Sequence, residues 1–203
     1  MSMAPRRTIT SAPRLRAMIA GLFRRARNEG GMAAVEFSLI LPILVLLWIG
    51  GVEVTQALSV DRRLNNLASS IGDLVARSKI VTYNDVTSIL GVSTGAMFPY
   101  TTTGLQMRVT AFDIDGSSNA KVAWSRSQGT TVYTTGNTMN TIVPSTLRVA
   151  NTQVIVAEVY YPYTPAVGKV ITGTITLNDR MFFVPRLVAQ IQLCDNNKAN
   201  CVS

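Results

Sequence analysis

The chain has 203 residues, of which 47% are hydrophobic and 15% are charged, and its formal net charge is +8. This length is consistent with one folded domain of about 120–150 residues plus attached segments. The net charge does not indicate a nucleic-acid partner, because residues 1–31 hold seven arginines and one glutamate and so carry +6 of it. No aromatic or helix-turn-helix pattern accompanies these arginines, and we therefore expect no nucleic-acid partner.

The first 31 residues form a basic leader. Arginine is its commonest residue, and Met1, Met3 and Met18 are alternative starts for it. An arginine-rich stretch directly before an apolar segment marks the cytoplasmic flank of a membrane span. The sequence therefore predicts a cytoplasmic N-terminus, a single membrane crossing and a C-terminal domain on the opposite side of that membrane.

A long apolar run follows the leader, and membrane lipid is its expected partner. Residues 33–60 exceed the roughly 20 apolar residues that cross a bilayer. Glu36 and Glu53 bracket the run, and Pro42 lies inside it, where a membrane helix tolerates proline if neighbours satisfy the freed backbone groups. An apolar stripe then recurs every three or four residues, at Ala57, Val60, Leu64, Leu67, Ile71, Leu74 and Ser78. We expect one helix over 32–80, membrane anchor first and amphipathic half second.

The rest of the chain, residues 81–203, is predicted to be a folded domain whose apolar period is close to two. A short helix is expected over 84–90 with Asn84 as its N-cap. The apolar segments predict strands over 105–114, 122–127, 153–161, 170–177 and 181–184, and Asp115-Gly116 supplies hairpin-turn chemistry. The fold class expected is α+β: a long N-terminal helix, transmembrane then amphipathic, packed on an antiparallel sheet of about four strands.

Two cysteines, Cys194 and Cys201, lie near the C-terminus of a chain that has no histidine. They cannot complete an ordinary four-ligand zinc site by themselves. In an oxidising compartment such a pair forms a disulfide, whereas two free thiols are the alternative. The sequence offers no metal site and no cofactor motif.

One short motif matches an enzyme signature only superficially. Residues 91–95 fit the G-x-S-x-G nucleophile elbow. That elbow needs a helix after the serine and a histidine to take its proton, but Pro99 interrupts the following segment and histidine is absent. We therefore expect the protein not to be an enzyme.

The start of the apolar run carries the most specific signal. Residues 30–37 read Gly-Gly-Met-Ala-Ala-Val-Glu-Phe. A basic leader that ends in Gly-Gly, with a carboxylate five residues further, resembles the cleavage site of type IV prepilins. This resemblance implies that a prepilin peptidase removes residues 1–31 by cutting after Gly31. Met32 then becomes the N-terminus, and Glu36 becomes the fifth residue of the mature chain.

The longer segment from residue 30 to residue 68 is similar to the TadE/TadG-like family of tight-adherence (Flp-type) pilus-assembly proteins. Phe37 follows the first carboxylate as in that family, and Pro42 and Glu53 stand where the family has a proline and a second carboxylate. The resemblance implies a minor pilin or pseudopilin that takes part in assembling or initiating a Tad type IV pilus used in surface adhesion. Its implied partners are the prepilin peptidase, other pilins and inner-membrane pilus-assembly proteins.

The alternative is a signal-peptide-bearing or single-span envelope protein with a ligand-binding β domain. Residues 39–51 would then be the apolar region of the signal, and Thr55-Gln56-Ala57 the cleavage site. Glu53 inside the cleavage region disfavours this alternative, as does the unbroken start of the stripe at Ala57. The mature N-terminus separates the two hypotheses, since it is Met32 in one and Leu58 in the other.

Overall fold

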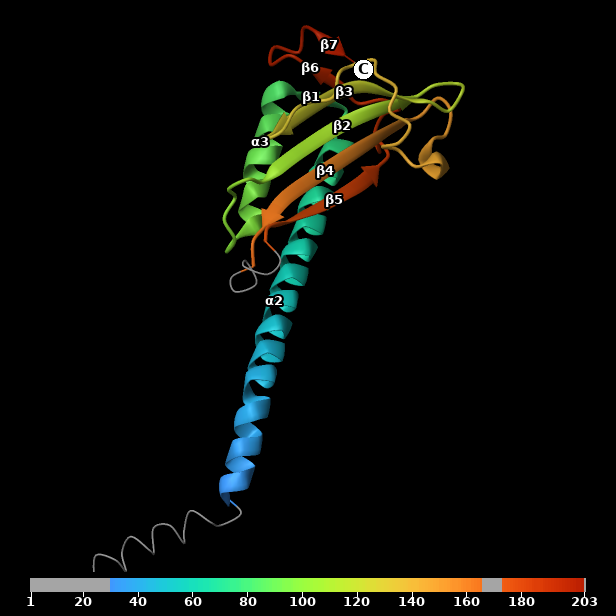
Figure 1. Ribbon diagram of the computed structural model, residues 1–203. Coiled ribbons are helices and arrows are strands. Elements are labelled where there is room, and N and C mark those ends of the chain that lie inside the picture. The colour runs from blue at the N-terminus through green and yellow to red at the C-terminus, as the bar shows by residue number, and fades with distance from the viewer. Residues whose placement is uncertain (1–29, 166–172, 203) are drawn as a thin grey trace, which may run out of the picture. The chain divides into compact units, whose positions relative to one another are not determined.

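A computed structural model describes residues 30–165 and 173–202 (Figure 1). Almost all of the predicted leader and part of the strand expected over 170–177 lie outside the described residues. The elements are α2 (Gly30–Ala76), β1 (Ile80–Thr82), α3 (Tyr83–Ser93), η1 (Thr94–Met97), β2 (Gln106–Ile114), β3 (Ala120–Gln128), η2 (Ser145–Leu147), β4 (Gln153–Tyr163), β5 (Ile175–Phe183), β6 (Gln192–Cys194) and β7 (Cys201–Val202). The chain divides into two compact units, Met1–Gly51 and Val52–Ser203.

The main sheet of the second unit confirms the predicted α+β fold. Its four strands are all antiparallel in the order β3-β2-β4-β5. The hairpin expected at Asp115-Gly116 joins β2 to β3, and its turn is closed by the Asp115 amide, which donates to the Asn119 carbonyl over 3.0 Å. The division of the last two predicted strands is wrong, because residues 175–183 form the single edge strand β5.

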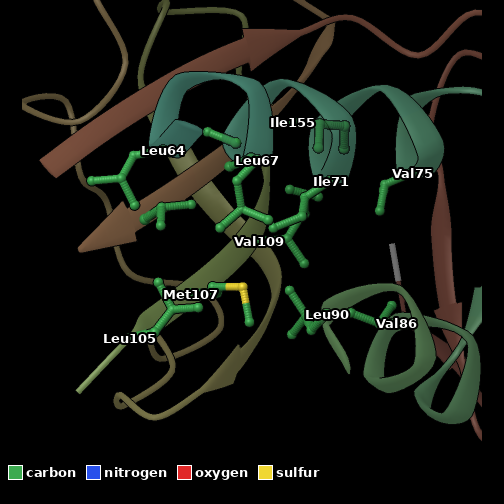
Figure 2. Packing of buried hydrophobic residues seen from close by; sticks show 14 of the residues in the cluster. Leu64, Leu67, Ile71, Val75, Val86, Leu90, Leu105, Met107, Val109 and Ile155 are labelled. Atoms are coloured by element: carbon green, nitrogen blue, oxygen red, sulfur yellow. The ribbon is translucent and has the colours of Figure 1, made fainter. Parts of the chain in front are cut away.

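The amphipathic part of α2 packs on this sheet through the predicted stripe (Figure 2). One continuous core joins helix side chains to the sheet positions that alternate along β2 and β4; it includes Val60, Leu64, Leu67, Ile71, Val75, Met107, Val109, Ile155, Ala157 and Val159. Each large apolar side chain of this kind stabilises the fold by about 1.5–3 kcal/mol when fully buried. The assignment of Leu74 to the stripe is wrong: it is 49% exposed, and Val75 occupies the core instead.

Helix α3 completes the cover of this core with Val86 and Leu90. Its start differs from the prediction, because Thr82 rather than Asn84 is the N-cap. The Asp85 amide donates to the Thr82 hydroxyl over 3.1 Å, and the Thr82 amide donates to the Asp85 carboxylate over 2.9 Å. This reciprocal capping box satisfies two amides that a helix start leaves without partners.

A second, smaller sheet holds the C-terminus in the order β1-β6-β7, with β1 and β6 parallel. Cys194 and Cys201 face each other across the β6–β7 hairpin and form a disulfide. The turn between them is organised by Asp195, whose carboxylate accepts from the Ala199 amide over 2.8 Å and from the Asn200 side chain over 2.9 Å. These hydrogen bonds, first that of the Ala199 amide, hold the pKa of Asp195 below its ordinary value.

Candidate functional site

The first unit exposes an apolar helix. Every residue from 31 to 48 is exposed, and the most apolar window of α2 buries none of its residues. Exposed apolar surface of this size marks a segment that meets another apolar phase or partner. Among the described residues one helix is long and apolar enough to cross a membrane, and it is this one.

The predicted processing site lies at the very start of that helix. α2 begins at Gly30, so Gly31 and Met32 have helical backbone. A glycine inside a helix costs about 1 kcal/mol relative to alanine, so two in succession make this first turn easy to unwind. An extended substrate strand can therefore form here with little loss of helix stability.

Glu36 and Phe37 lie one turn further on, and both are exposed on the helix surface. Pro42 is inside α2 and lacks the amide that would bond to the Ser38 carbonyl. The Ser38 hydroxyl donates to the Val35 carbonyl over 2.7 Å. The helix therefore lacks one backbone hydrogen bond at the Ser38 carbonyl, two residues after Glu36.

Glu53, the second carboxylate of the motif, belongs to the second unit. It lies four residues before Ala57 and seven before Val60, so it continues the stripe that faces the sheet. Tyr163, at the end of β4, has a buried hydroxyl with no hydrogen-bond partner among the described residues. Burial raises the pKa of Tyr163, and the nearby Tyr100 and Glu53 raise it further. Glu53 therefore sits beside the sheet rather than on the outer side of α2.

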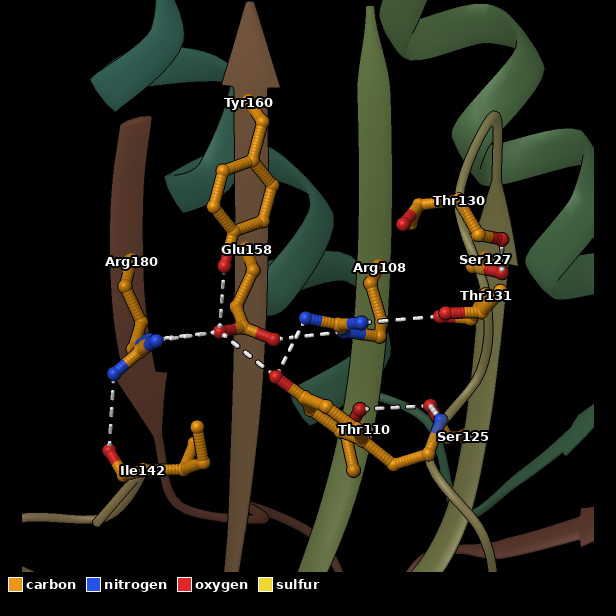
Figure 3. Close-up of polar contacts among 11 residues, drawn as sticks. Arg108, Thr110, Ser125, Ser127, Thr130, Thr131, Ile142, Glu158, Tyr160 and Arg180 are labelled. Carbon is orange, nitrogen blue, oxygen red and sulfur yellow. Dashed lines mark hydrogen bonds and ion pairs between the residues drawn. The ribbon is translucent and has the colours of Figure 1, made fainter. Parts of the chain in front are cut away.

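A buried ion-pair network lies on the sheet face away from α2 (Figure 3). The Glu158 side chain is 1% exposed and accepts from Arg108 Nε over 2.8 Å and from Arg180 Nη2 over 2.7 Å. Tyr160 donates to the same carboxylate over 3.2 Å. The Arg108 guanidinium also donates to the Tyr133 hydroxyl and lies 3.6 Å from the centre of that ring. Burial raises the pKa of Tyr133 to about 12, with a further contribution from Glu158.

This network was not predicted from the sequence, although its signal was present. Glu158 is the one charged residue of the apolar strand β4, and Arg108 stands at an outward position of β2. A buried carboxylate needs a cationic partner, so a single glutamate in such a strand predicts an arginine across the sheet.

The nucleophile-elbow motif and the Asp115-Gly116 turn lie in ordinary structural positions. Ser93 is the last residue of α3, not the tip of a strand-to-helix turn. Asp115 accepts from the Ser117 and Asn119 amides, each over 2.9 Å, as hairpin turns do. In residues 30–165 and 173–202 there is no cluster of three or more His, Cys, Asp or Glu side chains that could hold a metal ion.

The family model of TadE-like proteins matches residues 31–72. This segment is TadE-like. The match confirms the predicted resemblance and covers the apolar helix, Glu36, Pro42 and Glu53, together with most of the stripe that packs on the sheet. No curated protein and no solved structure matches the chain. The TadE-like segment thus lies within α2, and the sheets lie outside the matched residues.

Proposed function

We propose that the protein is a minor pilin or pseudopilin of a Tad (Flp-type) pilus, anchored in the inner membrane by the TadE-like segment and not an enzyme. The observation that carries the proposal is the exposed apolar helix of residues 31–48, with the glycine pair before it and Glu36 near its start. The arginines of residues 1–31 keep the N-terminus cytoplasmic, so the second unit lies in the periplasm or in the fibre.

Removal of residues 1–31 by a prepilin peptidase would free the Met32 amino group. Glu36 is then a carboxylate at the edge of hydrocarbon, where an unpaired charge costs several kcal/mol. The Met32 ammonium of a neighbouring subunit neutralises that charge when two helices come into register. Assembly is thereby favoured over isolated residence in lipid, which is the property required of a pilus subunit.

Processing is tested with a matched pair of substitutions, Gly31→Leu and Gly50→Leu. A Cβ at Gly50 meets no atom within 4 Å, so the second substitution controls for added bulk in the same helix. We expect Gly31→Leu to retain the leader and Gly50→Leu to be shortened normally, as seen by mass spectrometry of membrane fractions. N-terminal sequencing of the wild type should return Met32. A Leu58 terminus would support a signal peptide instead.

The pairing mechanism is tested with Glu36→Gln and Glu36→Asp in a strain that makes the pilus. Gln should leave insertion and processing intact, because it is neutral, but should abolish piliation and surface attachment. Asp keeps the charge and should retain part of the piliation. Wild-type piliation with Gln would refute the pairing, although the cleavage after Gly31 could still be correct.

A further inference from the structure

One aromatic side chain of the second unit points into solvent from a well-held loop. Phe98 follows η1 and is 79% exposed, whereas Met97 beside it is fully buried. The Phe98 amide donates to the Gly95 carbonyl over 3.2 Å, and the Tyr100 amide donates to the Met97 carbonyl over 2.8 Å. The loop is therefore fixed on both sides of the exposed ring.

Helix α2 holds the same loop. Arg63 Nη1 donates to the Phe98 carbonyl over 2.6 Å and to the Ala96 carbonyl over 3.3 Å. The Arg63 guanidinium carbon also lies 5.6 Å from the centre of the Tyr100 ring. One arginine thus contacts three residues of the loop, and these contacts hold the backbone of Phe98 in place while its ring stays exposed.

The loop lies at the end of the unit where α2 continues toward the apolar run. Pro99 and Tyr100 line a cavity of about 560 Å³ together with Tyr163. Tyr163 is in turn close enough to Glu53 for the carboxylate to affect its pKa. Arg63, which holds the loop, lies three residues after Val60, the first buried residue of α2. Phe98 therefore lies toward the end of the second unit at which that unit begins, at Val52.

Apolar side chains of α2 are exposed at this end of the second unit as well. Val54 is 61% exposed and Leu58 is 53% exposed. The polar headgroup layer adds about 5–8 Å on each side of the hydrocarbon core. Aromatic residues concentrate at this depth of a bilayer, since their rings are stabilised between apolar and aqueous phases.

We propose that this end of the second unit docks on phospholipid, with Phe98 inserted at the headgroup level of the bilayer that α2 crosses. The proposal rests on the membrane span proposed above. Continuity points to lipid as the occupant, because Val54 and Leu58 lie at the start of the second unit, a few residues after the exposed apolar helix of residues 31–48, and the exposed ring lies toward the same end of the unit.

The test is tryptophan fluorescence of the full chain in phospholipid vesicles, with lipids brominated either near the headgroup or deep in the acyl chain. Phe98→Trp is compared with Val149→Trp, each in a Trp48→Phe background. Val149 is 60% exposed and lies near Asn151, whose amide donates to the Ile114 carbonyl at the far end of β2. Trp124 is 1% exposed and common to both variants.

Docking predicts a blue shift and a loss of emission for the Phe98→Trp variant, strongest with bromine near the headgroup, and neither change for the Val149→Trp variant. Equal, unquenched emission from both variants would overturn the docking. The native Trp48 of the wild type reports on the span separately, because deep bromine should quench it. If the lipids quench Trp48 but do not quench the Phe98→Trp variant, the docking is refuted and the span is kept. If they quench neither, both the docking and the span are refuted.

Discussion

Replacing Glu158 with Gln should unfold the second unit at a markedly lower temperature. The side chain is 1% exposed and separates two guanidinium groups, Arg108 at 2.8 Å and Arg180 at 2.7 Å. Gln keeps the shape of the side chain but removes its negative charge. It also replaces one carboxylate oxygen, which accepts a hydrogen bond, with an amide NH₂ group that faces an arginine N–H. Breaking a buried ion pair from one side costs about 3–5 kcal/mol, which is a large part of the roughly 5–15 kcal/mol by which domains are stable.

The assay is thermal unfolding of the detergent-solubilised full chain, followed by circular dichroism. Each kcal/mol lowers the Tm of a domain of this size by about 2–4 °C, so Glu158→Gln should lower it by roughly 6–20 °C. Asp61→Asn is the matched control, because it removes the same charge from an exposed site of α2 and should cost less than about 0.5 kcal/mol.

Arg180→Gln should have an intermediate effect. The Arg180 side chain is 35% exposed, so in the variant water can replace part of the interaction between its guanidinium and Glu158. Glu158 also keeps its ion pair with Arg108. Equal Tm values for Glu158→Gln and Asp61→Asn would show that the carboxylate is not held as an ion and would refute this reasoning.

Three further predictions concern the packing around glycines, the cap of α3 and the disulfide. Gly72→Ala should destabilise the unit by about 1–3 kcal/mol in urea titrations, since the new Cβ meets the Phe183 ring, whereas Gly91→Ala meets nothing within 4 Å and should stabilise α3 by about 0.5–1 kcal/mol. The hydrogen bond from the Thr82 amide lowers the pKa of Asp85 from 3.8, so the advantage of wild type over Asp85→Asn should be full above that pH and should vanish as the pH falls through the lowered pKa. Reducing the C-terminal disulfide should lower the free energy of unfolding by about 3 kcal/mol or less, measured with and without dithiothreitol, because the loop is short.

The long helix and three of the four main strands are predictable because their physical causes are local. A helix that covers a sheet shows an apolar period near 3.6, and strands packed on both faces are runs of branched and aromatic residues such as Val154–Val159. Leu74 and Val75 are neighbours in the sequence, and both fit within the apolar face of an amphipathic helix, which is roughly 100° wide or more. Only the packing of the surrounding elements decides which of them is buried.

Strand β5 is divided wrongly by the sequence pattern because three polar residues, Asn178 to Arg180, interrupt its apolar residues. An edge strand tolerates polar side chains on its more exposed positions. Arg180 is there for a tertiary reason, since its guanidinium reaches Glu158 on the neighbouring strand β4. This contact joins two residues that are 22 positions apart in the sequence. A local sequence pattern contains no information on such a pairing.

The carboxylates of Glu158 and Glu36 both lie among apolar residues, but they differ in the charged partners that the described part of the chain gives them. Glu158 is buried by the fold, and the chain itself supplies two arginines and a tyrosine to hold its charge. Glu36 is exposed on an apolar helix, and the described residues provide no ion pair for it. In water that arrangement has little cost, but at the edge of hydrocarbon the charge needs a partner. In the function proposed above, the Met32 ammonium of a neighbouring subunit is that partner once residues 1–31 have been removed.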